Sequence, residues 1–387
     1  MDKVMMIYGG EYYYWKPVIL AIAAAAAALM ALGVRAWRGE KLLPMAVALP
    51  IGTVLSVIFA RAIHWYCRFE SYESLRAALT QLRGGGYSLM GVFFGMLLAF
   101  LLVRLAQLTR DLPSLLDCAV PGAALGVALG RLGDLFTAAD RGKMIFADEA
   151  LHRLPYSSAI INATSGATEW RFATFAFQSL WCAALFVIFL VASFFRRKRP
   201  LAHEKWTNGN LFALFMTLYC CGQVMMDSTR YDALFLRSNG FVSLEQIVCG
   251  VALAAVLTAY SVRSIRVRRF RFWHPVLWLL ALAGLGLAGY MEYYVQRHGD
   301  LYVFSYSLMA AGLGLFFLVT FGMFLTSMKP ADPPPPMAVT VPEASAPAAA
   351  PEPPAAPAPP KSLPPMDGLD FDDYLEFFKV DTDSDRK

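Results

Sequence analysis

Two arginine-aspartate pairs stand out because each lies at the end of an apolar segment. Arg131 and Asp134 close the stretch LLDCAVPGAALGVALGRLGD, and Asp227 and Arg230 close a stretch that ends in MMDSTR. Residues three apart share one face of a helix, so each pair projects its charges together. Ionisable side chains at membrane depth cost roughly 2.5 to 3.5 kcal/mol each on insertion scales. The pairs therefore indicate a function such as the binding of a polar substrate.

Arginine offers a planar fork of donors that matches a phosphate, so Arg131 is predicted to clamp a lipid headgroup. The alternative is a buried structural ion pair between Arg131 and Asp134 inside a helix bundle. Further polar residues follow Arg230, namely Asp232, Arg237, Glu245 and Gln246. A solvated outer loop is sufficient to explain Asp232 and Arg237.

A glycine-rich segment, RGGGYSLMGVFFG, leads into another apolar stretch. Its adjacent glycines, among them Gly85 and Gly86, allow positive φ angles and let a ligand approach main-chain N–H groups at a helix start, where phosphate is well accommodated. Tyr87 and Gly91 complete this candidate binding element. The alternative is that the glycines permit close packing between helices.

The composition is that of a membrane protein, with 57% hydrophobic residues, 16% charged residues and a mean hydropathy of +0.48. A span needs about 20 apolar residues to cross a hydrocarbon core of about 30 Å. Nine stretches are long enough, near residues 17–37, 43–66, 88–108, 114–137, 172–195, 209–226, 242–262, 273–295 and 302–327. We therefore expect an all-α, polytopic transmembrane helical bundle, with the first span retained because no cleavable signal is evident.

Basic residues predict the orientation, because positively charged short loops remain cytoplasmic. They follow every odd-numbered span up to the seventh, as Arg35, Arg38 and Lys41; Arg104 and Arg110; Arg196 to Arg199; and Arg263, Arg266, Arg268, Arg269 and Arg271. We expect the N-terminus outside, the C-terminus in the cytoplasm, and the loops at 67–87, 138–171 and 227–241 on the outer side. The net charge of +5 is then a topology signal, and nucleic-acid binding is not indicated.

The remaining composition signals concern the cysteines and the C-terminal region. The six cysteines show no metal-ligand spacing and are read as small apolar packing residues. Residues 329–365 are rich in proline and alanine and are predicted to form a disordered linker. Residues 366–387 form an acidic amphipathic segment, either a disordered tail or a short helix that docks on a cytosolic partner.

In this order, the elements resemble the prolipoprotein diacylglyceryl transferase family. The resemblance covers about residues 17–262, and its most specific part runs from Asp117 through Pro121, Gly126, Gly130, Arg131 and Gly133 to Gly142. It implies a seven-span transferase core at 1–262. The two additional transmembrane helices at 263–328 lie outside the usual seven-helix plan.

The resemblance implies transfer of a diacylglyceryl group from phosphatidylglycerol to the cysteine thiol of an exported prolipoprotein, in the bacterial cytoplasmic membrane and with no metal or organic cofactor. Arg131 would hold the phosphate in a chamber open to the outer leaflet, and Arg230 would be a second cationic group. Asp134, Asp227 or Asp140 would accept the thiol proton. The implied catalytic residues are Arg131, Asp134, Asp227 and Arg230, and the implied substrate-binding residues are Gly85, Gly86, Tyr87, Gly91, Asp140, Gly142 and Gln246.

Several family positions are substituted. Met90 replaces a histidine, Asp134 an asparagine, Ala139 a glutamate, Gln223 an arginine, Asp227 a glutamate, and Phe177 and Gln178 a tyrosine-glutamate pair. These departures leave a second hypothesis open. In it, the protein is a catalytically silent relative that binds phospholipid or lipoprotein precursor and acts as an adaptor through its cytoplasmic tail. A transporter is disfavoured because broken helices with inverted repeats are not apparent.

Overall fold

The protein was analysed as a computed structural model that describes residues 4–8, 11–80, 86–144, 151–161, 166–198, 208–236, 240, 242–298 and 301–328. The chain divides into two units, Met1–Asp332 and Pro333–Lys387. All described residues belong to the first unit. The predicted linker and acidic segment lie outside the described residues, and the predicted domain boundaries within the chain stay predictions.

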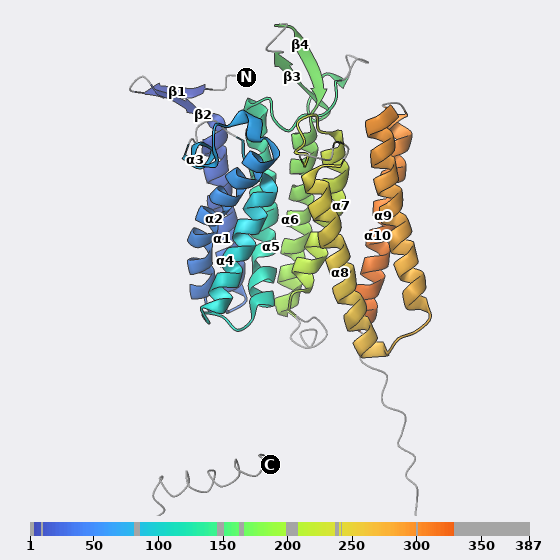
Figure 1. The fold of residues 1–387 in the computed structure, drawn as a ribbon. Helices are drawn as coiled ribbons and strands as arrows, with labels where there is room; N and C mark the ends of the chain where they lie inside the picture. Colours follow the sequence, from blue (N-terminus) through green and yellow to red (C-terminus); the bar gives the residue numbers. More distant parts are fainter. Residues whose placement is uncertain are drawn as a thin grey trace, which may run out of the picture. The chain divides into compact units, whose positions relative to one another are not determined.

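The first unit is a bundle of long apolar helices (Figure 1). They are α1 (Trp15–Trp37), α2 (Leu43–Cys67), α4 (Leu89–Leu105), α5 (Leu112–Leu132), α6 (Thr174–Lys198), α7 (Asn210–Thr229), α8 (Leu244–Arg268), α9 (Trp273–His298) and α10 (Tyr302–Met328). In the described part of the chain, all except α4 are long and apolar enough to cross a membrane. The 17 residues of α4 rise about 26 Å, slightly less than the hydrocarbon core. The predicted polytopic all-α membrane fold is confirmed.

Two β-hairpins that hydropathy did not predict lie at one end of the bundle, which we call the hairpin end (Figure 1). The first pairs β1 (Val4–Tyr8) with β2 (Glu11–Tyr14), and the second pairs β3 (Ser157–Ile161) with β4 (Thr168–Phe172). These strands are only four or five residues long, so none forms an apolar run of the length that a membrane span needs. The span predicted from residue 172 therefore starts at Thr174, because Phe172 belongs to β4.

Three short helical segments complete the hairpin end. They are a 3-10 turn at Phe69–Ser71, α3 at Leu75–Thr80 and a 3-10 turn at Gly133–Phe136 that extends α5. The helices that carry the predicted basic clusters, α1, α4, α6 and α8, all run away from the hairpin end (Figure 1). This is the arrangement that the charge pattern requires, and the assignment of the hairpin end to the outer side stays a prediction.

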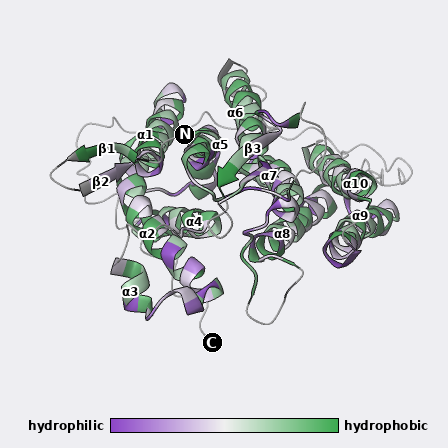
Figure 2. Ribbon diagram, turned by 90° about the horizontal axis from the view of Figure 1, so that it is seen from above, coloured by the Kyte–Doolittle hydropathy of each residue, from purple (hydrophilic) through white to green (hydrophobic). Residues whose placement is uncertain are grey.

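Helix α5 is the central element, since it contacts α1, α4, α6 and α7 (Figure 2). Its glycines allow α1 to approach closely: a Cβ on Gly122 would lie 2.4 Å from the carbonyl oxygen of Ala27. A glycine likewise allows α4 to pack closely against α2, since a Cβ on Gly91 would lie 2.3 Å from the Cα of Ala60. Small residues spaced in this way let membrane helices pack backbone to backbone. The close packing against α1 holds α5 within the bundle, and the C-terminal turn of α5, which carries Arg131, lies at the hairpin end (Figure 1).

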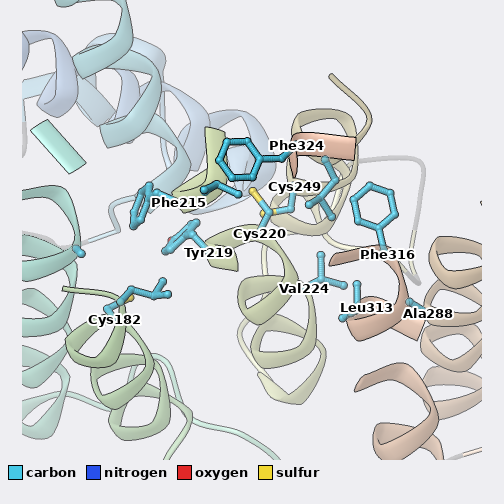
Figure 3. Packing of buried hydrophobic residues seen from close by; sticks show 14 of the residues in the cluster. Cys182, Phe215, Tyr219, Cys220, Val224, Cys249, Ala288, Leu313, Phe316 and Phe324 are labelled. Atoms are coloured by element: carbon cyan, nitrogen blue, oxygen red, sulfur yellow. The ribbon is translucent and has the colours of Figure 1, made fainter. Parts of the chain in front are cut away.

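A cluster of buried apolar side chains joins α4 and α5 to the helices α6 to α10, and Figure 3 shows part of it. Cys182, Cys220 and Cys249 lie among these side chains, as packing residues do. Helices α9 and α10 pack through Gly284 and Gly312, and α10 also contacts α7 and α8. Of the two helices beyond the predicted seven-span core, α10 therefore packs directly against α7, the helix that ends at the second arginine-aspartate pair, and α9 packs against α10.

Candidate active site

Charged side chains from four separate segments gather at the hairpin end. They come from the last turns of α5 and α7, the first turn of α8 and the segment between α5 and β3. Arg131, Asp134, Asp140, Asp227 and Arg230 meet in this cluster, and all five are predicted site residues. Buried charges are tolerated only when they are paired or bind a charged ligand. The cluster is therefore the candidate active site.

Arg131 lies in the last turn of α5, and only one nitrogen of its guanidinium, Nη1, contacts described carboxylates. Its Nη1 forms an ion pair with Asp140 and lies 3.7 Å from Asp134 Oδ2. Its Nε and Nη2 are buried and have no hydrogen-bond partner among the described residues. Because the residue is only 8% exposed, water does not readily satisfy these donors. The Nε–Nη2 edge, which we call the free edge of Arg131, thus carries two buried donors that no described protein group satisfies.

Arg230, directly after α7, is surrounded by carboxylates. Its three guanidinium nitrogens contact Asp140 at 2.6 Å, Asp227 at 3.0 Å, Asp232 at 3.2 Å and Glu245 at 3.3 Å. Burial opposes its charge, but these carboxylates outweigh burial and raise the pKa of Arg230 well above its usual range. Arg230 therefore acts as the electrostatic centre that keeps the acidic side chains together.

Asp140 links the two arginines and is held in an unusual backbone conformation, with φ of +54°. Its carboxylate contacts Arg131 and Arg230, while its backbone N–H donates to Asp232 Oδ2 at 2.9 Å. Burial favours the neutral form, yet the two guanidinium groups hold the pKa of Asp140 well below its usual range. Asp140 is consequently a poor acceptor for a thiol proton. The interpretation of Asp232 as a solvated loop residue is wrong, since its carboxylate belongs to the cluster.

Asp134 and Asp227 each have a partner that the sequence did not identify. Lys16, in the first turn of α1, places its Nζ 2.5 Å from Asp134 Oδ1. The Ser243 hydroxyl, at the start of α8, donates a hydrogen bond to Asp227. Neither partner is close to its aspartate in sequence, so only the folded chain reveals it. Both contacts tie an additional helix terminus to the cluster.

Two of the positions that the family resemblance marks as substituted contact each other. The Gln178 side chain of α6 donates a hydrogen bond to the Gln223 side chain of α7, which in turn donates to Glu245 Oε2 at 2.8 Å. The family resemblance predicts glutamate and arginine at positions 178 and 223. Replacing both members of a buried charged pair by neutral hydrogen-bonding groups keeps the bundle neutral and avoids an unpaired charge. The two glutamines therefore hydrogen-bond to each other without introducing a charge.

We expect positions 178 and 223 to be energetically coupled. Gln178→Glu alone buries a carboxylate without a cation and should lower stability by about 3 to 5 kcal/mol. Adding Gln223→Arg should recover most of this loss, as measured by the thermal unfolding midpoint of purified protein in detergent. Strictly additive effects of the two substitutions would contradict the pairing.

Gly142 and Gln246 hold the backbone around the cluster. Gly142 pairs with Arg230 in a β-bridge, and a Cβ at this position would lie 2.9 Å from the Thr229 carbonyl oxygen. Gln246 accepts a hydrogen bond from the Ser243 backbone N–H at 3.0 Å in a capping box that starts α8. The contacts of both residues are thus with the protein scaffold, and their predicted role in substrate binding stays a prediction.

The described residues of the glycine-rich segment contact Arg61 of α2. Gly86, with φ of +75°, accepts a hydrogen bond from Arg61 Nη1 at 3.0 Å, and the Tyr87 ring lies 5.3 Å from the Arg61 guanidinium carbon. Gly91 packs against α2, so the packing alternative accounts for its position. Gly85 lies outside the described residues. Substrate binding by this segment stays a prediction.

A cavity of about 390 Å³ opens at the hairpin end between the end of α2 and the segment after Arg230. Its lining residues are Cys67, Arg68, Phe69, Glu70, Ser71, Ala233, Phe235 and Leu236. Arg68 Nη2 donates to the Asp232 carbonyl oxygen at 3.2 Å, and Asp232 contacts Arg230. Asp232 therefore connects the cavity wall to the charged cluster. The expected chamber beside Arg131 stays a prediction.

Comparisons with known proteins agree on one family. The family model described as prolipoprotein diacylglyceryl transferase matches residues 13–261. Relatives named phosphatidylglycerol-prolipoprotein diacylglyceryl transferase include one from Clostridium kluyveri, 25% identical over 53% of this chain and 74% of the relative. Another, from Synechocystis, is 29% identical over 43% of this chain and 58% of the relative, and one from Mycobacterium tuberculosis is 27% identical over 51% and 43%. The last two are each matched over less than two thirds of their length.

The matched region contains the whole charged cluster, from α1 through the first turns of α8. Helices α9 and α10 and the second unit lie beyond it. Membrane-length helices and bacterial relatives together identify a multi-spanning protein of the bacterial inner membrane. The chain belongs to the prolipoprotein diacylglyceryl transferase family of membrane transferases.

Proposed function

We propose that this protein transfers a diacylglyceryl group from phosphatidylglycerol to the cysteine thiol of an exported prolipoprotein. The observation that carries the proposal is the free edge of Arg131, a buried guanidinium of the cluster whose Nε and Nη2 have no hydrogen-bond partner among the described residues. A phosphodiester offers two non-bridging oxygens, which share its negative charge, at the spacing of such an edge. Family membership supports the same reaction.

In the proposed reaction, the cysteine thiolate attacks the diacylglyceryl carbon that is bonded to the phosphate oxygen. A sulfur–carbon bond forms, the carbon–oxygen bond breaks, and its electron pair leaves with glycerol phosphate. Arg131 stabilises the negative charge that builds on the leaving phosphate. No metal or organic cofactor is required, because the guanidinium supplies the positive charge.

The thiol, with a pKa near 8.5, must lose its proton before the attack. Of the three predicted acceptors, Asp140 is held ionised by two arginines, and Asp227 contacts both Arg230 and Ser243. Asp134 has its guanidinium neighbour at 3.7 Å and a lysine partner that is 29% exposed. We assign the role of accepting the thiol proton to Asp134. Arg230 is then the second cationic group, and its role is to hold Asp140 and Asp227 in place.

The proposal also includes the orientation, with the hairpin end on the outer side, the N-terminus outside and the C-terminus in the cytoplasm. Prolipoproteins would then reach the site after export. The alternative function as a silent adaptor, and a cytosolic partner for residues 366–387, depend on a segment outside the described residues. No contact in the described part of the chain favours them.

The test is to incubate full-length protein in lipid nanodiscs with labelled phosphatidylglycerol and a peptide that carries a lipobox cysteine. We expect a thioether-linked diacylglyceryl peptide and an equal amount of released glycerol phosphate, both measured by mass spectrometry. A peptide with serine in place of the cysteine is the control. Absence of the thioether product, with the protein folded and both substrates present, would refute the proposed activity.

A further inference from the structure

A third arginine near the cluster, Arg141, forms no ion pair with the described carboxylates. Arg141 is 3% exposed, and its Nε and Nη1 are buried without a hydrogen-bond partner among the described residues. Only its Nη2 is occupied, by a hydrogen bond of 2.6 Å to the Thr137 carbonyl oxygen. The family resemblance assigns no role to this position. Arg141 therefore requires an explanation that the cluster itself does not provide.

The backbone around Arg141 is fixed from two sides. The Arg141 carbonyl oxygen accepts a hydrogen bond from the Tyr231 backbone N–H at 3.0 Å. The next residue, Gly142, donates to the Phe172 carbonyl oxygen at 2.7 Å and forms the bridge to Arg230. The Arg141 guanidinium lies over the Phe175 ring at 5.4 Å. The side chain is thus held inside the protein and is not a surface arginine folded back by chance.

The electrostatics of Arg141 differ from those of Arg131 and Arg230. Those two arginines form ion pairs with aspartates of the cluster, whereas Arg141 forms none with the described carboxylates. Burial lowers the pKa of Arg141, and the nearby Tyr231 and Asp134 only partly offset this effect. Burying a cation without a partner costs several kcal/mol. An anion bound beside Arg141 would remove this cost.

Arg131 and Arg141 flank the same loop. Arg131 precedes it and contacts Asp134 and Asp140, while Arg141 follows it and contacts Thr137. Each guanidinium has two unpartnered nitrogens. The negative charge of a phosphodiester is shared by two non-bridging oxygens and that of a phosphate monoester by three, so either can accept hydrogen bonds from more than one guanidinium. Asp134 connects them, since it lies 3.7 Å from the Arg131 guanidinium and also acts electrostatically on Arg141.

We propose that Arg141 is a second phosphate-binding residue, which holds the phosphate of the lipid donor together with Arg131. This inference rests on the proposed function, because it assigns a further contact to the same substrate. The same guanidinium would bind the glycerol phosphate that is released. The ligand chemistry is a phosphate ester, and its two sources are the lipid headgroup and the free product.

The test compares Arg141→Gln with the full-length parent protein in nanodiscs. We expect the KM for phosphatidylglycerol to rise at least about tenfold, because a charge-assisted contact is lost. Arg141→Lys should restore part of this loss, since it keeps the charge but not the fork. The matched control is Arg171→Gln, an arginine that already has a partner in Glu169 at 2.8 Å, and it should leave the KM unchanged.

A second arm distinguishes the two sources of phosphate. Inhibition of transfer by soluble glycerol phosphate is measured with the parent protein and with Arg141→Gln. Weaker inhibition of the variant, together with the raised KM, assigns the site to phosphate esters in general, and a raised KM alone assigns it to the lipid headgroup. Unchanged values in both arms would refute the proposal.

Two further measurements separate this inference from other failures. The thermal unfolding midpoint of Arg141→Gln should not fall, because the substitution removes an unpaired buried cation; a large decrease would indicate a structural role and contradict the proposal. Retention of phosphatidylglycerol by the purified protein, measured by native mass spectrometry, does not require transfer. A parent protein that does not transfer would refute the proposed function, whereas equal lipid retention by parent and variant would refute the role of Arg141.

Discussion

Arg131→Gln is expected to reduce diacylglyceryl transfer by about 10² to 10³-fold, the usual effect of losing a preorganised group that stabilises developing negative charge. The guanidinium of Arg131 is buried, and its Nε and Nη2 have no hydrogen-bond partner among the described residues, so both donors can act on the leaving phosphate. Its charge would act mainly on the leaving phosphate. The kcat should therefore fall more than the affinity for phosphatidylglycerol.

The measurement is the rate of thioether formation with the lipobox peptide. Arg131→Lys should recover a small part of the rate, because lysine supplies the charge without the planar fork. Arg104→Gln, which changes an exposed arginine at the end of α4, is the matched control and should transfer at the parental rate. Parental activity in Arg131→Gln would contradict the proposed role of Arg131.

The second large effect concerns stability. Arg230→Gln should destabilise the protein by about 3 to 5 kcal/mol, because it leaves buried carboxylates facing one another without their shared cation. Asp140, Asp227 and Glu245 all lie within 3.3 Å of the Arg230 guanidinium. Activity should be lost as well, since the same residue holds the segment that contains Asp140.

This prediction is tested by thermal unfolding in detergent, with a second substitution as an internal check. Adding Glu245→Gln to Arg230→Gln removes one of the unpaired carboxylates and should restore part of the stability. The replacement is conservative in shape and keeps a hydrogen-bonding partner for Gln223. An unfolding midpoint unaffected by Arg230→Gln would show that the ion pairs around Arg230 contribute nothing to the fold.

Hydropathy predicted the helices well, because a bilayer requires long apolar segments regardless of how they pack. It did not predict the strands at the hairpin end. The strand Thr168–Phe172 reads TEWRF, and its pairing with Ser157–Ile161 depends on a hairpin whose polar residues resemble any exposed loop. The strand therefore shortened a predicted span at its start, where Thr174 begins α6.

The site residues Arg131, Asp134, Asp227 and Arg230 were found from charge within apolar segments and from the family resemblance, and the structure brings them together. The sequence could not identify Lys16, because a lysine in the first turn of a membrane helix usually lies at the water interface. Arg141 was missed for a different reason. Its significance depends on burial without a partner, which is a property of the folded protein alone.

The most direct test of the account is an experimental structure of the full-length protein in nanodiscs that contain phosphatidylglycerol. We predict density for a lipid phosphate within hydrogen-bond distance of Arg131 Nε and Nη2, with Asp140 still contacting Nη1. A lipid-bound structure in which the phosphate lies elsewhere, and in which the free edge of Arg131 is occupied by protein groups, would contradict the account.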